Sequence, residues 1–410
     1  MWFPACFDPP QLEPTGTLIA IMTDTNEKAL LPPGLGDVLA PGAQIEAETV
    51  ERLMSAFGAH GYERVKPPLI EFEENLLADR GAAIADQTFR LMDPISRRML
   101  ALRPDMTLQV ARIAETRLKN APRPLRLAYA GEVVRIKGGQ LRPERQFGQT
   151  GVELIGTDAT EADVEVILMA VEALENLGVK NTSVDLGMPP LVPAIINDMI
   201  RTPLSKDDHG QLRQALDRKD QAAIKAMADV CGKDAIQLLT ALLSATGPAK
   251  SGLDKLQALN LDRDAGNAIG KLGAVIHALL AAKPDLMLTI DPIESRGFEY
   301  HTGVSFTFFA KNIRGELGSG GRYTAANGSR ASEEATGFTL FMDTILRSLP
   351  QPKAGNRLFL DPGTDPAIAR NWRSQGWVAI LGMDKTQTGE TEARRLCCTH
   401  ILEGGEARKL

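Results

Sequence analysis

Two strand-like segments on either side of a short loop place the strongest constraint on the fold of this chain. Leu125–Ile136 and Gln146–Ile155 each read as a strand, and Lys137–Arg145 between them is rich in glycine and arginine. The segments around this pair alternate between the 3.6-residue period of helices and the two-residue period of strands. We therefore expect a sheet with helices packed on it.

The second of these strands has one unusual face. Side chains alternate along a strand, so Gln149, Gly151 and Glu153 share one face, while Thr150 and Val152 lie on an ordinary apolar face. A buried carboxylate is costly unless it is paired with a cation or well hydrogen-bonded. The ammonium group of a ligand would satisfy Glu153, and so would a salt bridge to a nearby arginine. The pattern alone leaves both possibilities open.

The chain divides by pattern into several regions. Residues 31–350 mix helix and strand patterns, with helices predicted at Gln44–Gly61 and at Glu161–Leu177, before the C-cap residue Gly178. Within them, residues from about 204 to 284 show repeated helical spacing and are interpreted as a helical insertion. Residues 351–410 alternate strand and helix, which predicts a small α/β unit.

The N-terminal residues 1–30 are expected to form a disordered segment. Residues 1–21 contain no lysine or arginine, and the apolar run Leu18–Met22 is too short for the core of a signal peptide. Met22 opens a more ordinary sequence, so we expect the native start there. No apolar run approaches the roughly 20 residues needed to cross a bilayer, so no membrane partner is expected.

The composition bears on partners and location. The formal net charge of -6 gives no general basic surface, which counts against nucleic acid as the main partner. Four cysteines in 410 residues do not form a disulfide framework, which favours a reducing cytoplasm. Cys397, Cys398 and His400 lie close together, but no second ligand pair follows at a zinc-site spacing. We expect no bound metal.

Two further patches carry polar groups suited to a small ligand. In LRPDMT, Asp105 and Thr107 share a face if this turn is extended, as Pro104 encourages. In SRGFEYHTG, Arg296 can hold a carboxylate with a forked pair of hydrogen bonds, and Tyr300 offers a flat wall and a hydroxyl. His301 beside Tyr300 is interpreted as a structural or exposed group in preference to a catalytic base.

Taken together and in order, these segments resemble the catalytic domain of histidyl-tRNA synthetase, from about Leu31 to Leu349. Motif 1 of the class II synthetases corresponds to the segment that ends at Pro67-Pro68, and motif 2 to residues 131–156. The histidine-specific motif corresponds to SRGFEYHTG, and a Gly-Gly-Arg-Tyr segment is present at residues 320–323. The resemblance implies an α+β fold: a class II synthetase-like antiparallel sheet flanked by helices, with a helical insertion and a small C-terminal α/β unit.

The resemblance also implies an amino-acid pocket. In the family, the positions matched by Asp105, Thr107, Gln149 and Glu153 receive the α-amino group and the imidazole of histidine. Those matched by Arg296 and Tyr300 lie on the carboxylate side and against the ring. Arg135 keeps the position of the motif 2 arginine. The implied histidine-binding residues are Asp105, Thr107, Arg135, Gln149, Glu153, Arg296 and Tyr300.

The half of the site that would activate histidine with ATP is damaged. The acidic-basic pair that follows the motif 2 arginine is replaced by Lys137 and Gly138. In motif 3, Phe341 replaces the glycine that passes close to adenine, and Thr344 replaces the arginine that pairs with the γ-phosphate. Loss of one such preorganised contact costs about a hundredfold in rate. We expect no catalytic residues and no cofactor.

This profile resembles the regulatory subunits of ATP phosphoribosyltransferase, the synthetase-like chains of the hetero-oligomeric enzyme. Shared features are the length, the LRPDMT segment, the damaged motif 3 and the short C-terminal part. The resemblance implies a noncatalytic subunit that the short-form catalytic subunit needs in the first step of histidine biosynthesis. It also implies histidine as the feedback ligand and a homodimer core.

Two alternatives from other classes stay open at the level of sequence. One is an enzyme: a divergent histidyl-tRNA synthetase, or an aminoacyl ligase that holds ATP differently, for which Thr344 is the discriminating residue. The other is a synthetase-like accessory factor that binds nucleic acid, which predicts salt-sensitive RNA binding.

Overall fold

The computed structural model describes residues 31–77, 85–139, 142–199, 204–294, 300–325, 332–350 and 355–410. The chain forms two compact units. The larger runs from Thr49 to Leu349, and the smaller contains Pro350–Leu410 with the described residues up to Glu48. Residues 1–30, which we expected to be disordered, and the expected start at Met22 lie outside the described residues.

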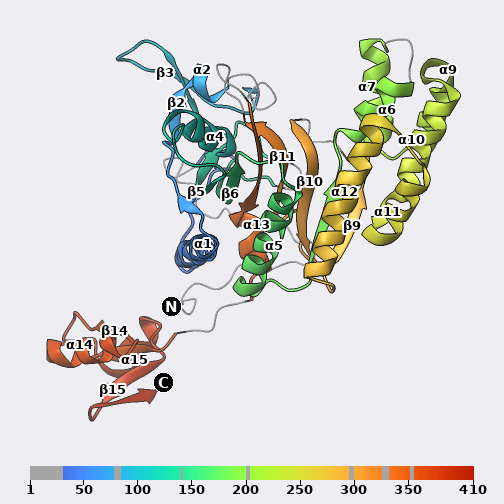
Figure 1. Ribbon diagram of the computed structural model, residues 1–410. Helices are drawn as coiled ribbons and strands as arrows, with labels where there is room; N and C mark the ends of the chain where they lie inside the picture. Colours follow the sequence, from blue (N-terminus) through green and yellow to red (C-terminus); the bar gives the residue numbers. More distant parts are fainter. Residues whose placement is uncertain are drawn as a thin grey trace. The chain divides into compact units, whose positions relative to one another are not determined.

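A large mixed sheet forms the centre of the larger unit (Figure 1). In spatial order, its described strands are β1 (Glu63–Arg64), β5 (Leu125–Val134), β6 (Gln146–Ile155), β12 (Glu333–Phe341), β11 (Gly318–Ala325), β10 (His301–Ala310), β7 (Thr182–Gly187), β9 (Met287–Asp291) and β8 (Gly247–Pro248). Neighbours from β5 through β7 are all antiparallel, as predicted. The pairs β1–β5 and β7–β9 are parallel, which the sequence did not indicate.

Helices α1 (Gly42–Ala59), α5 (Thr160–Leu177) and α12 (Arg263–Ala282) contribute to the main apolar core. Val152 and Leu154 of β6 belong to this core, so the predicted apolar face of that strand is confirmed. The chain leaves α5 through Gly178, whose φ of 99° is left-handed and therefore favours glycine. The predicted bounds of this helix and of both long strands agree closely with the structure.

The predicted helical insertion is present. After α6 (Leu191–Met199) come α7 (Lys206–Asp217), α8 (Gln221–Ala226), α9 (Ala228–Cys231), α10 (Lys233–Ala245) and α11 (Ala249–Ala258), and then α12. An ion pair between Lys219 and the buried Asp291 fastens the insertion to the end of β9. The Thr246 hydroxyl lies 3.4 Å from the same carboxylate.

The expectation of no apolar run long enough to cross a membrane was wrong for α12. Arg263–Ala282 has the length and hydropathy of a membrane span, and 44% of its apolar window is buried inside the protein. It packs against α5 and α6. These contacts account for its apolar composition as that of a core helix.

A second apolar cluster occupies the opposite face of the sheet. It joins α4 (Thr107–Thr116) to side chains of β5, β6, β11 and β12. A small three-stranded sheet in the order β2-β4-β3 lies before α4, and two short helices complete the unit. Their bounds are β2 Ile70–Phe72, α2 Glu73–Leu76, β3 Arg90–Met92, β4 Met99–Leu102 and α13 Met342–Ser348.

The C-terminal residues form a four-stranded sheet in the order β14-β13-β15-β16. The elements are β13 (Arg357–Leu360), α14 (Pro366–Ser374), β14 (Val378–Leu381), α15 (Gly389–Arg395), β15 (His400–Glu403) and β16 (Glu406–Lys409). One apolar cluster packs under α14 and another under α15, so both faces are covered. In the described part of the chain, no three His, Cys, Asp or Glu side chains group as a metal site.

Candidate functional site

The carboxylate of Glu153 lies at the centre of a buried polar network. Its side chain is almost fully buried, with the residue 1% exposed. The Tyr323 hydroxyl donates to Oε2 at 2.9 Å, and the Tyr129 hydroxyl to Oε1 at 3.2 Å. Among the described residues, no lysine or arginine forms an ion pair with this carboxylate. The salt-bridge alternative expected an arginine beside this carboxylate; the hydroxyls of Tyr129 and Tyr323 contact it instead.

Two glycines make room for this network. Across β6 and β12, Gly337 lies opposite Glu153, and a Cβ atom there would collide with the carboxylate. Across β5 and β6, Gly151 lies opposite Tyr129, and a Cβ atom there would be 2.6 Å from the phenol oxygen. Because Gly151 has no side chain, it leaves space above the sheet, and the Tyr129 side chain fills that space.

Burial controls the charge of this site. Desolvation, with a smaller effect of the nearby Asp105 charge, raises the pKa of Glu153 from 4.5 to about 8. Burial also holds the pKa of the Tyr129 and Tyr323 phenols well above their usual range, so both stay hydrogen-bond donors. At neutral pH the free site therefore favours a neutral Glu153. A bound cation would stabilise the ionised form.

Asp105, Thr107 and Gln149 are brought together as predicted, by a different local geometry. Thr107 is the first residue of α4, so the turn is not extended and that expectation was wrong. Instead, the Asp105 carboxylate accepts the Thr107 backbone N–H at 2.8 Å and the Gln149 amide at 3.0 Å. The Met106 N–H donates to Gln149 Oε1 at 3.2 Å. The start of α4 is thereby tied to β6.

Thr107, Arg135 and Tyr300 lie around this network. The Thr107 hydroxyl is 3.4 Å from the Tyr129 hydroxyl. Arg135 donates through Nε to the Pro104 carbonyl at 3.2 Å. Tyr300 is 44% exposed, and its ring centroid lies 4.1 Å from that of His301. Arg296 lies outside the described residues.

A small cavity opens beside Glu153. It has a volume of about 20 Å³ and is lined by Thr107, Glu153, Tyr300, His301, Tyr323 and neighbouring residues of β11 and β12. That space holds about one water molecule. The cavity combines acidic, hydroxyl and aromatic groups, which together suit a small cationic group.

The side chains of Phe341 and Thr344 contact neighbouring residues of the chain. The Arg142 guanidinium lies 3.9 Å from the Phe341 ring centroid and donates through Nε to both oxygens of Asp343 at 3.1 Å. The Phe341 ring packs edge-on against Phe147, with centroids 6.2 Å apart. Thr344 is buried, and its hydroxyl accepts from Arg347 at 3.1 Å. Neighbouring side chains of the chain itself therefore pack around Phe341 and Thr344.

Sequence reasoning missed Tyr129 and Tyr323 as members of the site. Tyr323 belongs to the Gly-Gly-Arg-Tyr segment, which was noted only as a resemblance. Its neighbour Arg322 points away and is structural, because it donates to the Asp163 carboxylate at 2.9 Å and to the Thr157 carbonyl at 2.9 Å. The alternation of side chains along β5 indicates that Tyr129 faces away from the main core. Which residue Tyr129 contacts depends on the register of the strands.

Comparisons with known proteins agree with this architecture. The family model for histidyl-tRNA synthetase matches residues 34–345. A solved Bacillus halodurans chain, titled an ATP phosphoribosyltransferase regulatory subunit/histidyl-tRNA synthetase, is 25% identical with a TM-score of 0.79, over 91% of this chain and 97% of its own. Histidyl-tRNA synthetase from Nostoc sp. PCC 7120 has a TM-score of 0.75 at 18% identity, over 91% and 90% of the two chains, and shows the fold alone. The larger unit is a class II, histidyl-tRNA synthetase-like domain.

Curated relatives narrow this class to one family. An ATP phosphoribosyltransferase regulatory subunit from Paramagnetospirillum magneticum is 52% identical over 93% of this chain and 98% of its own length. The one from Rhodospirillum centenum is 50% identical over 93% and 96%. The chain belongs to the ATP phosphoribosyltransferase regulatory subunits, a family of histidine biosynthesis.

Proposed function

We propose that this chain is a noncatalytic subunit that the short-form catalytic subunit of ATP phosphoribosyltransferase requires, and that it carries feedback inhibition by histidine. Three observations support the proposal: the family, the intact polar network around Glu153, and the self-packed side chains at Phe341. The observation that carries the histidine part is the buried Glu153 carboxyl with two phenol donors and no described cationic partner.

Histidine matches the chemistry of this network. Its ammonium group would supply a cationic partner for Glu153, an imidazole N–H would supply a donor beside the two phenols, and Asp105 lies close enough to influence the same carboxyl. The cavity of about 20 Å³ is too small for an imidazole ring. We therefore expect the half-exposed Tyr300 to move outward when histidine binds, as side chains at binding sites commonly do.

The chain should not activate histidine. In the presence of histidine, ATP and labelled pyrophosphate, we expect no exchange above background, because Arg142, Phe341 and Asp343 pack together where the resemblance to the synthetases implies a nucleotide. Pyrophosphate exchange with an authentic histidyl-tRNA synthetase provides the positive control. Robust histidine-dependent exchange by this chain would support the divergent synthetase or ligase instead.

Reconstitution tests the regulatory role directly. Formation of phosphoribosyl-ATP by the short catalytic subunit should rise at least about tenfold when this chain is added, and histidine should then reverse the gain; a tenfold change corresponds to about 1.4 kcal/mol of coupling. A catalytic subunit that is equally active with and without this chain would refute the assignment. Light scattering on the purified chain would test the proposed homodimer core in the same preparation.

A further inference from the structure

Arg103 is a buried arginine of the LRPDMT segment, and its guanidinium bonds to two backbone carbonyls. The residue is only 6% exposed. Its Nε donates to the Glu132 carbonyl at 2.7 Å, and its Nη1 donates to the Pro67 carbonyl at 3.0 Å. Burying a charged group is costly unless it is well hydrogen-bonded. These two bonds therefore fix where the guanidinium lies.

The backbone of Arg103 joins the same two parts of the chain. Its N–H donates to the Leu69 carbonyl at 3.1 Å, and its own carbonyl accepts the Val134 N–H at 3.1 Å. Farther along, the Gln109 amide of α4 donates to the Pro68 carbonyl at 2.8 Å. The segment before β2 and the end of β5 are therefore both fastened to the residues that lead into α4.

A glycine of β5 provides the space for this guanidinium. A Cβ atom at Gly131 would lie 2.3 Å from Nη2 of Arg103. In the β5–β6 pair, Gly131 lies opposite Gln149, whose amide donates to the Asp105 carboxylate. The guanidinium thus contacts β5 at the position paired with Gln149. Because Arg103 and Asp105 are two positions apart in the chain, the bonds of Arg103 restrict where Asp105 can lie.

We propose that Arg103 is a positioning residue of the candidate histidine pocket; this rests on the proposed function. Its two side-chain bonds hold the turn that carries Asp105 and Thr107. The Asp105 carboxylate accepts the Thr107 N–H and the Gln149 amide, so a displaced turn would lose both bonds. In the described part of the chain, Arg103 is not among the residues that line the cavity, so it acts on a ligand through these neighbours.

Arg103→Lys in the full-length chain tests this role. Lysine keeps the charge but ends in one nitrogen, so it cannot reproduce the fixed pair of bonds to two carbonyls. Isothermal titration should show at least about tenfold weaker histidine binding, because hydrogen bonds of a charged donor are lost. Gly131→Ala, which displaces the guanidinium without removing it, should have a similar effect. When Asp105→Asn is already present, Arg103→Lys should add less than about a twofold loss, since residues that act together are not additive.

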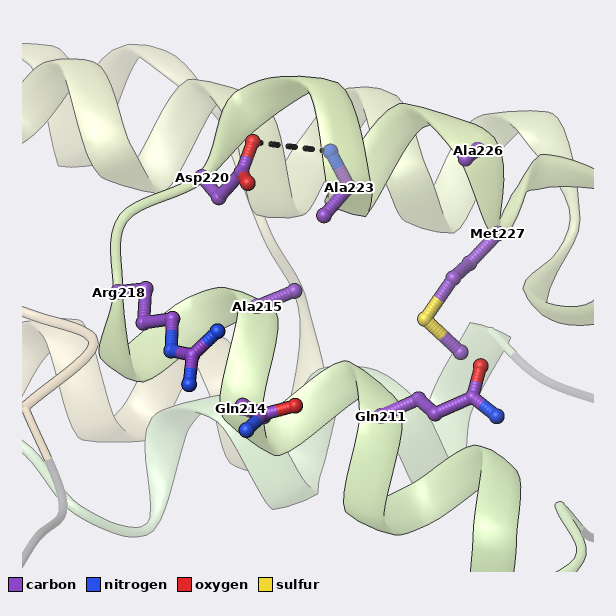
Figure 2. A pocket seen from close by; sticks show the side chains of 8 residues that line it. All are labelled: Gln211, Gln214, Ala215, Arg218, Asp220, Ala223, Ala226 and Met227. Atoms are coloured by element: carbon purple, nitrogen blue, oxygen red, sulfur yellow. Dashed lines mark hydrogen bonds between the residues drawn. The ribbon is translucent and has the colours of Figure 1, made fainter.

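Two arginine-to-lysine substitutions elsewhere serve as controls. Arg357 of the C-terminal unit is also 6% exposed, and its guanidinium donates to the carbonyls of Cys397 at 3.0 Å and Leu396 at 3.3 Å. Arg218 lies in the larger unit, where its exposed side chain lines a hollow of about 340 Å³ between α7 and α8 (Figure 2). Arg357→Lys and Arg218→Lys should both bind histidine like the wild type.

Amide hydrogen exchange without histidine measures whether the turn is held in place. In Arg103→Lys, residues 104–110 should lose protection, because the Asp105 and Gln149 side chains no longer hold the first amides of α4. Unchanged exchange in α5 and α12 would establish that the variant is folded. Arg357→Lys should leave the exchange of residues 104–110 unchanged.

The outcomes separate this proposal from the proposed function. Wild-type histidine affinity in Arg103→Lys, an equal loss with and without Asp105→Asn, or unchanged protection of residues 104–110 would each overturn the positioning role while leaving the pocket intact. A wild-type chain that does not bind histidine would instead refute the proposed function.

Discussion

Replacing Glu153 with alanine should weaken histidine binding more than tenfold. The variant removes the buried carboxyl that the Tyr129 and Tyr323 hydroxyls hold in place. A hydrogen bond to a charged group contributes about 1.5–3 kcal/mol, which is roughly a 10- to 150-fold change in affinity. Isothermal titration of histidine into the purified chain measures the effect.

A second variant of Glu153, with a control, separates the effect of the side chain's charge from that of its size. Glu153→Gln keeps the size of the side chain but cannot ionise, so it should also weaken binding. Glu165→Gln is the matched control, because Glu165 pairs with Arg126 outside the cavity at 2.9 Å. Its histidine affinity should equal that of the wild type. Wild-type affinity in both Glu153 variants would contradict the proposed pocket.

Glu153→Gln should also stabilise the ligand-free protein at alkaline pH. The folded-state pKa of Glu153 is about 8, against an ordinary value of 4.5. Between these values the unfolded chain has lost the proton that the folded chain keeps, so wild-type stability falls by about 1.4 kcal/mol for each pH unit. The effect is absent below pH 4.5 and complete above pH 8, where it totals about 5 kcal/mol. The glutamine variant lacks it.

Urea unfolding at pH 5 and pH 8.5 measures this difference. The stability gap between Glu153→Gln and the wild type should widen in favour of the variant as the pH rises. Glu165→Gln should be less stable than the wild type by a similar amount at both pH values, because the Arg126 hydrogen bond lowers the pKa of Glu165 from 4.5 and its stabilisation is already present at pH 5. A gap for Glu153→Gln that is independent of pH would show that this carboxyl has an ordinary pKa.

Local pattern was sufficient for much of the fold. The strands Leu125–Val134 and Gln146–Ile155 and the helix Thr160–Leu177 follow from the hydrophobic period and from a glycine C-cap. These signals depend on near neighbours in the chain, so no tertiary contact is needed to read them. The parallel pairing of β1 with β5 had no local signal, because both directions of pairing use the same alternation of side chains.

The sequence predicted several residues of the candidate site, but it did not predict how they are arranged. Asp105 was expected on an extended turn, but its carboxylate accepts the N–H of Thr107 and so helps to start a helix there. A short polar side chain can favour either backbone state, and packing against β6 decides between them. Arg142 had no assigned role, since its contact with Phe341 joins residues almost two hundred positions apart.

The sequence by itself determined that Gln149 and Glu153 share one face of a strand, and the resemblance to histidyl-tRNA synthetase implies that Phe341 and Thr344 stand where ATP contacts would be needed. Side-chain alternation and residue identity are local properties, so they can be read without coordinates. Only the tertiary structure decided what meets Glu153. Strand register brings Tyr129, Tyr323 and Gly337 to its carboxyl from three other strands. The resulting burial raises the pKa of Glu153 to about 8, because desolvation depends on every neighbour that excludes water.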